Sequence, residues 1–124
     1  MRVKIDTKEI FHVISIEESK LTAIMAEDLE KLVKTELETH GKSLIIDMQH
    51  VEEIEENVAL SINRLHADVY AAGRSFVICA LQPAVKNALD TSGVLEALNT
   101  TPTASEAWDI VQMEEIEREL GLDS

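Results

Sequence analysis

The segment Leu44-Ile45-Ile46-Asp47-Met48-Gln49-His50-Val51 decides the fold of this chain. It opens with an unbroken apolar run that stops at an acidic residue, and such a run is typical of a strand covered on both faces in a parallel sheet. A second run of this kind spans residues 76–80. Between the two, apolar residues recur at helical spacing up to Gly73, namely Val58, Ile62, Leu65 and Val69. This order predicts a right-handed strand–helix–strand crossover onto a parallel sheet.

The residues before this segment predict a long amphipathic helix and, before it, a β-hairpin. Thr22 is suited to cap the start of the helix and Gly41 to end it. Val3 and Ile5 alternate with polar residues, and the apolar segment 10–16 follows a short turn, as in two paired strands. The apolar positions of the helix, spaced by three or four, are Leu21, Ile24, Met25, Leu29, Leu32, Val33 and Leu37.

The residues after the second apolar run predict further helices. Pro83 is placed for the first turn of a short helix through Leu89, residues 91–93 break it, and residues 94–98 resume it briefly. Thr103 and Glu106 match a capping box at the start of the last helix. Its acidic end, residues 114–119, is expected to be a solvated face, and residues 121–124 to fray. Its apolar residues are Ala107, Trp108, Ile110, Val111, Ile116 and Leu120, with Trp108 expected to pack on the sheet.

Together these elements predict an α/β fold with a mixed, mostly parallel sheet of four to five strands and about four helices. Helices are expected to cover mainly one face of the sheet. The length of 124 residues suits one domain, and neither a repeat nor a linker rich in proline or glycine divides the chain. We therefore expect a single domain over residues 1–124.

The charge of the chain excludes several classes of partner. With 24 acidic and 11 basic side chains, the net charge is −13, which argues against nucleic acid and against anionic membrane surfaces. No apolar run approaches the ~20 residues of a membrane span, so membrane insertion is not expected. The lone cysteine, Cys79, excludes an intrachain disulfide and fits a reducing compartment, so we expect a cytoplasmic protein.

The residues that carry catalytic or metal chemistry elsewhere form no such pattern here. Phosphate-binding glycine loops are absent, so no cofactor is expected. The spacing of the four histidines fits no zinc motif, and His12, His40 and His50 are expected at the surface, with His66 partly buried. Cys79 is expected to be packed in the core rather than to act as a nucleophile.

Two acidic features have competing interpretations. Residues 52–56 contain four glutamates that could bind Ca²⁺ or Mg²⁺, but they lack the alternation and central glycine of an EF-hand loop. A solvated acidic loop is therefore the favoured interpretation. Asp47, at the end of its strand, is in the region where α/β sheets bind ligands, but a role in fixing the loop is favoured.

Several segments, in order, resemble those of STAS domains, the fold of anti-sigma factor antagonists. Residues 44–51 resemble the family's "LVLDLSGV" strand, and residues 53–59 match its "F-I-D-S-S-G-L" loop in position. Residues 81–94 resemble its "xSPxVxxxLxxxGL" segment, and residues 103–107 its closing "S-x-E-E-A-L" helix. The resemblance implies a STAS fold and a non-enzymatic bacterial regulator of transcription that works by partner switching. Such domains bind an anti-sigma factor, often a serine kinase that phosphorylates the second serine of the loop.

The sequence departs from the family where that switch lies. Aligned residue by residue, the family's Asp-Ser-Ser-Gly falls on Glu55, Glu56, Asn57 and Val58, so Asn57 replaces the phosphoacceptor serine. An amide cannot accept a phosphoryl group, although Asn57 is suited to cap the helix that follows. In the favoured interpretation, Asn57 imitates an unphosphorylated serine. In the alternative, Glu55 and Glu56 imitate the phosphorylated state.

The resemblance also predicts where a partner binds. The surface centres on the start of the second long helix, and the loop before the first long helix flanks it, because both loops emerge at one edge of the sheet. We expect the domain to be a monomer or weak dimer, and we expect it to bind no metal. The predicted contact residues are Glu55, Glu56, Asn57, Val58, Ser61, Ser19, Lys20 and Thr22.

Two other functions compete with the antagonist. One is a STAS subunit of a larger assembly, such as a lipid-transport ATPase complex or a stress-sensing complex. The other is a small enzyme or ligand-binding protein of flavodoxin-like build, which needs a cofactor loop or an acid–base pair in a pocket. The sequence offers neither, so a protein-binding module is favoured.

Overall fold

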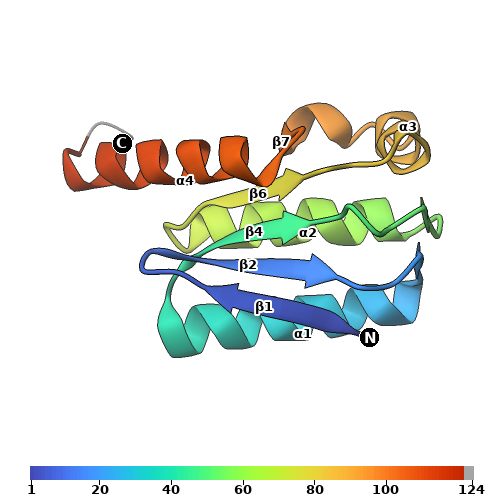
Figure 1. The fold of residues 1–124 in the computed structure, drawn as a ribbon, viewed down its shortest axis with the longest axis horizontal. Helices are drawn as coiled ribbons and strands as arrows, with labels where there is room; N and C mark the ends of the chain where they lie inside the picture. The colour runs from blue at the N-terminus through green and yellow to red at the C-terminus, as the bar shows by residue number, and fades with distance from the viewer. Residues whose placement is uncertain (122–124) are drawn as a thin grey trace.

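Five strands form one mixed sheet within residues 1–121, the part of the chain that the computed structural model describes (Figure 1). Their order across the sheet is β1-β2-β4-β6-β7. β1 runs antiparallel to β2, and the other neighbouring strands are parallel, so the predicted mixed α/β sheet is confirmed. The strands are β1 (Val3–Thr7), β2 (Phe11–Ile16), β4 (Ser43–Asp47), β6 (Phe76–Cys79) and β7 (Asn99–Thr101). The expected fraying at residues 122–124 lies outside the described residues.

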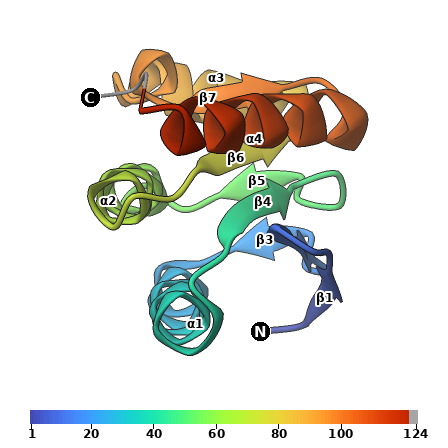
Figure 2. The same ribbon diagram turned by 90° about the vertical axis from the view of Figure 1, so that its left-hand side faces the viewer.

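Four α-helices pack around the sheet in this part of the chain: α1 (Ala23–His40), α2 (Val58–Ala71), α3 (Pro83–Thr91) and α4 (Ala104–Glu119). A 3₁₀ turn, Leu95–Ala97, precedes β7. α1 and α2 lie against one face of the sheet, and α4 lies against the other (Figure 2). The expectation that helices cover mainly one face therefore fails for α4. None of the helices in residues 1–121 is long and apolar enough to cross a bilayer.

The central strands explain why both faces need cover. Side chains alternate between the two faces of a strand, so an unbroken apolar run makes both faces apolar. The larger core cluster joins the helices α1 and α2 to Ile14, Leu44, Ile46, Phe76 and Ile78. The smaller cluster consists of Phe11, Val13, Ile45, Val77 and Cys79 from the strands and Ala107 and Val111 from α4.

The predicted ends of the helices are largely confirmed. The hydroxyl of Thr22 accepts a hydrogen bond from the Met25 amide at 3.2 Å, at the start of α1. Thr103 does the same for the Glu106 amide, at 3.3 Å, at the start of α4. Gly41 ends α1 with a left-handed φ of 61°, a conformation that costs glycine little because it has no Cβ.

The second half of α4 is oriented differently from the prediction. Ile116 and Leu120 were expected on the packed face, but they are 55% and 66% exposed. Glu114 and Glu115, which precede Ile116, turn toward the sheet instead. Nearer the start of the helix, Trp108 packs on Phe11 with ring centroids 5.4 Å apart, and Lys8 Nζ lies 5.2 Å from its ring, although 36% of Trp108 is exposed.

Glu115 fastens α4 to the amino end of β4, so the prediction of a solvated face is wrong for this residue. Its carboxylate accepts a hydrogen bond from Ser43 Oγ at 2.6 Å. It also pairs with Arg74 at 3.2 Å and with Arg118 at 2.8 Å. Ser43 is fully buried, and a buried hydroxyl needs a hydrogen-bond partner, which explains why an acidic residue is held here.

Glu114 makes the neighbouring attachment, so the prediction of a solvated face is wrong for it too. It accepts hydrogen bonds from the Tyr70 hydroxyl, at 2.7 Å, and from the hydroxyl of Ser75, which precedes β6. Burial, followed by the hydrogen bond to Glu114 and its charge, raises the pKa of Tyr70 to about 12. The phenol therefore remains a hydrogen-bond donor throughout the physiological range of pH.

Candidate functional site

A second, two-stranded sheet brings the loop before α1 and the loop before α2 together. β3 (Lys20–Leu21) pairs in parallel with β5 (Glu53–Ile54). The amides of Glu52 and Glu53 both donate to the Ser19 carbonyl, at 2.7 and 3.1 Å. Both helices begin at the end of the large sheet toward which the β4 arrow points (Figure 1). The two loops thus lie at one edge of the sheet, as the sequence predicted.

Glu55 joins the starts of the two helices directly. Its carboxylate accepts a hydrogen bond from the Ala23 amide, in the first turn of α1, at 2.7 Å. Its own amide donates to the Leu21 carbonyl at 3.0 Å. A carboxylate is favoured at the positive end of a helix dipole, so this contact stabilises α1 while the residue itself precedes α2. Glu55 is exposed, so its position combines a structural role with access to solvent.

Asn57 lies at the start of α2, but it does not cap the helix through its side chain. Its backbone is already helical, with φ −85° and ψ −4°, and its amide makes no capping hydrogen bond. A capping side chain needs extended backbone to reach back to the helix, as Thr22 and Thr103 have. The predicted cap is therefore wrong. The Asn57 side chain is instead exposed at the start of α2.

The remaining predicted contact residues differ in their access to solvent. Ser19, Lys20 and Glu56 are exposed, and Thr22 is half-buried because it caps α1. Val58 was predicted to contact a partner directly, and this prediction is wrong because the residue is fully buried in the larger core cluster. As the first residue of α2, it faces the sheet and anchors the helix start beneath the exposed Asn57.

Ser61 is half-buried one turn into α2 and already has neighbours. Its hydroxyl lies 3.5 Å from the Asn57 carbonyl, to which it donates, and accepts a hydrogen bond from Arg64 at 3.3 Å. Arg64 also pairs with Glu30 of α1 at 3.0 Å. These contacts tie the first turns of α2 to α1, and they leave Ser61 less accessible than Asn57.

Two exposed apolar residues adjoin this edge and were not predicted as contacts. Ile24, in the first turn of α1, is 74% exposed, and Leu60, in the first turn of α2, is 51% exposed. Leu60 is out of phase with the apolar positions of its helix, which was a usable signal in the sequence. Ile24 was assigned to the buried face of α1. We call the exposed parts of Ser19, Lys20, Ile24, Glu55, Glu56, Asn57 and Leu60 the helix-start surface.

The loop after β4 is fixed beside the helix-start surface by polar contacts. The Asp47 carboxylate accepts from the backbone amide and the side-chain amide of Gln49, at 3.0 and 3.2 Å. The Gln49 carbonyl in turn accepts from the Gln82 side chain at 2.7 Å. Asp47 therefore acts as a loop-fixing residue, as favoured from the sequence.

Cys79 and the histidines are placed in part as predicted. Cys79 is fully buried, and burial, with the nearby Asp47 charge, raises the pKa of its thiol to about 12, so it stays a packed, protonated thiol. His66 is half-buried against Tyr70, as expected. His12 was expected at the surface but is 1% exposed, because it alternates onto the face of β2 that α1 covers. Burial lowers the pKa of His12 despite the opposing charge of Glu36.

Solved structures with this fold include several anti-sigma factor antagonists. A serine-to-glutamate variant of RsbS from Moorella thermoacetica is 22% identical, with a TM-score of 0.74, over 90% of this chain and 96% of that chain. An anti-sigma factor antagonist from Mycobacterium paratuberculosis is 17% identical, with a TM-score of 0.77, over 90% and 93%. The Bacillus cell-fate determinant SpoIIAA, in its phosphorylated form, is 13% identical, with a TM-score of 0.66, over 89% and 99%.

No curated protein shows significant similarity to the chain. At these levels of identity the solved structures establish a shared fold. The sequence pattern of the STAS domain family goes further, because it matches residues 3–107, which is most of the chain. The chain belongs to the STAS domain family.

Proposed function

We propose that this STAS domain is an anti-sigma factor antagonist that binds an anti-sigma factor of the serine-kinase type and is not switched by phosphorylation at Asn57. It acts by binding alone and catalyses no reaction. The observation that carries the proposal is the exposed Asn57 at the start of α2, where the family has its phosphoacceptor serine. The family membership supports the broader role of a regulatory module.

The helix-start surface has the composition of a docking site. It presents two carboxylates and an amide beside two apolar side chains, Ile24 and Leu60. Interfaces combine apolar contact with complementary charge, which sets the rate of association and the choice of partner. A partner that fits this surface carries a basic patch next to an apolar one. Binding is then weakened by added salt.

The state that the surface imitates follows from the charges. A phosphate adds about −1.5 to −2 charge and three acceptor oxygens, whereas Asn57 is neutral. One carboxylate oxygen of Glu55 already accepts a hydrogen bond from the Ala23 amide. This contact supports a structural role for Glu55 rather than a role as a substitute for phosphate. The domain therefore behaves as a permanently unphosphorylated antagonist.

Capture of the partner tests the surface. The full chain is immobilised and exposed to native lysate, beside a Glu56→Lys, Asn57→Asp double variant and a Glu119→Lys control at the exposed end of α4. We expect mass spectrometry to identify a kinase-type anti-sigma factor with the wild type and the control. The double variant should retain at least about tenfold less of this anti-sigma factor than the wild type does, because the change of charge lies inside the interface.

Equal retention of that partner by the double variant contradicts the surface assignment. Capture of an ATPase or membrane component in stable stoichiometry, in place of a kinase, contradicts the antagonist and favours a subunit of a larger assembly.

Phosphorylation tests the missing switch. With the captured kinase and ATP, we expect no phosphate on the wild-type chain and one phosphate on the Asn57→Ser variant, since this substitution restores an exposed hydroxyl at the start of α2. The phosphorylated variant should then release the kinase, because the added charge lies within the interface. Intact-mass spectrometry and peptide mapping measure the result. Phosphate on Ser61 of the wild type contradicts the proposal.

A further inference from the structure

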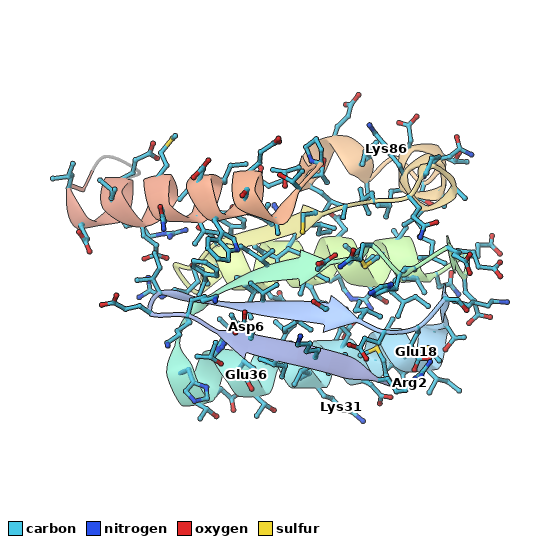
Figure 3. All side chains as sticks on the ribbon, viewed as in Figure 1. Arg2, Asp6, Glu18, Lys31, Glu36 and Lys86 are labelled. Carbon is cyan, nitrogen blue, oxygen red and sulfur yellow. The ribbon has the colours of Figure 1, made fainter. Side chains whose placement is uncertain are left out.

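Three side chains with metal-binding atoms meet at the end of the sheet away from the helix-start surface. Glu36 and His40 lie one turn apart near the end of α1, and His12 reaches them from β2. Glu36 Oε2 is 3.2 Å from His12 Nε2 and 2.9 Å from His40 Nδ1. The three ligand atoms lie within 4.8 Å of one another. Figure 3 labels Glu36 on α1, away from Glu18 and Arg2 at the opposite end.

One nitrogen of the buried His12 ring lacks a hydrogen-bond partner in this cluster. It is 1% exposed, and its Nδ1 lies 3.0 Å from Thr7 Oγ1. Its Nε2 is buried without a hydrogen bond, since the short distance to Glu36 is not accompanied by hydrogen-bonding geometry. When Nδ1 donates its proton to Thr7, the Nε2 lone pair faces a carboxylate with nothing between them. The same carboxylate oxygen is hydrogen-bonded to His40 Nδ1 at 2.9 Å, and a cation at this point satisfies the Nε2 lone pair while it replaces the proton between Glu36 and His40.

We propose that His12, Glu36 and His40 form a binding site for a divalent transition metal, with zinc as its natural occupant. Two imidazoles and one carboxylate are a usual set of three protein ligands for Zn²⁺, with the fourth position left to water. Bond lengths of about 2.0–2.1 Å in a tetrahedron separate the ligand atoms by about 3.3 Å. The separations of Glu36 Oε2 from the two histidine nitrogens, 3.2 and 2.9 Å, are within a few tenths of an ångström of that value, and the two histidine nitrogens lie within 4.8 Å of each other.

The surroundings of the site favour a cation and give it access. α1 ends beside it, and the negative end of a helix dipole stabilises positive charge. His40 is 47% exposed and Glu36 15%, which leaves the outer side open to a water ligand and to entry of the ion. Thr7 supplies the outer hydrogen bond that fixes the orientation of a ligating histidine. The positive charge of Lys42 lies near His12 and opposes the binding of a cation. The Lys42 ammonium donates a hydrogen bond to the Lys8 carbonyl at 2.7 Å.

A metal at this point links β2 to the end of α1. The two elements are separated in the chain by the loop before α1, and the site adds a bond between them on the face that α1 covers. Binding therefore stabilises the folded domain, because the ligands are brought together only by folding. The site is independent of the proposed function, since it lies at the other end of α1 from Glu55.

Zinc titration of the full, tag-free chain after removal of metal tests the proposal. We expect one zinc ion per chain by calorimetry and the visible absorption of tetrahedral cobalt when Co²⁺ replaces it. His40→Ala should weaken zinc binding at least about tenfold, since it removes a ligand from an exposed position. Glu36→Gln should act in the same direction. His50→Ala, which changes an exposed histidine elsewhere, should bind zinc as the wild type does.

Thermal unfolding provides a second readout. Saturating zinc should raise the melting temperature of the wild type and of His50→Ala by several degrees, and it should raise that of His40→Ala by clearly less. Circular dichroism confirms that each variant is folded before titration. The proposal is overturned if the wild type binds no zinc, if His40→Ala binds as tightly as the wild type, or if His50→Ala loses the ion.

Discussion

Replacing Phe76 by alanine is expected to lower the free energy of unfolding by about 3–5 kcal/mol, the usual cost of emptying an aromatic core position. Phe76 is 1% exposed and belongs to the larger core cluster. On β6 it lies opposite Leu44 of β4, and its ring meets the edge of His66 with centroids 6.0 Å apart. Since domains of this size are stabilised by about 5–15 kcal/mol in total, the variant should be barely folded at 37 °C.

Urea denaturation followed by circular dichroism measures this effect. The urea concentration at the midpoint should fall, while the slope of the unfolding free energy against urea concentration stays unchanged, as for a loss of stability without a change in the surface exposed on unfolding. Leu60→Ala is the matched control, because it removes an apolar side chain that is half exposed, and it should change stability by about 0.5 kcal/mol or less. Similar losses for the two variants contradict the assignment of Phe76 to the centre of the core.

Replacing Glu115 by alanine is expected to cost about 2–3 kcal/mol, although the residue lies on the outer helix of the fold. The change leaves the buried Ser43 hydroxyl without its acceptor and removes the shared partner of Arg74 and Arg118. The Glu115 side chain is 17% exposed, so solvent replaces these contacts only in part. The second half of α4 should therefore separate from the sheet more readily.

Two matched variants isolate the charge in this contact. Glu115→Gln keeps an oxygen that accepts from Ser43 but loses the attraction to the two arginines, so its stability should lie between those of Glu115→Ala and the wild type. Glu119→Ala removes an exposed carboxylate from the same helix and should have little effect. Amide hydrogen exchange in residues 104–119 locates the change. Equal stability of the two alanine variants contradicts an anchoring role for Glu115.

The main elements of the fold could be predicted because their patterns are local. The apolar run at residues 44–46 and the helical spacing between Val58 and Val69 each follow from side-chain periodicity alone. Thr22 and Thr103 were identified as caps because the chemistry of a helix start depends on only a few residues. The family resemblance was recognised from the order of such segments.

The features that were missed depend on contacts between distant residues. β7 has the sequence Asn-Thr-Thr, without an apolar signal, and pairs because β6 offers it a free edge. Ile116 was expected to be packed, but in this half of α4 the polar attachments of Glu114 and Glu115 face the sheet. His12 was predicted to lie at the surface. The residues next to it in the sequence do not show that a helix distant in the chain covers its face of the strand.

For the helix-start surface too, the sequence predicted the location but not the contacts between distant residues. The sequence placed residues 19–22 and 55–57 at one edge, because the ends of parallel strands meet there. It did not show that Glu55 caps α1 rather than α2, since that hydrogen bond joins residues far apart in the chain. It also assigned Asn57 a capping role that depends on one backbone angle, which a residue pattern does not specify.

The edges of the large sheet limit how copies of this domain associate. β1 forms one edge, and it places Lys4 and Asp6 beside its unpaired backbone groups, both exposed. The other edge, β7, is only three residues long. Charged and short edge strands discourage the addition of another strand, the route by which sheet proteins aggregate. Both edges of the sheet therefore resist the edge-to-edge joining of two copies of this domain.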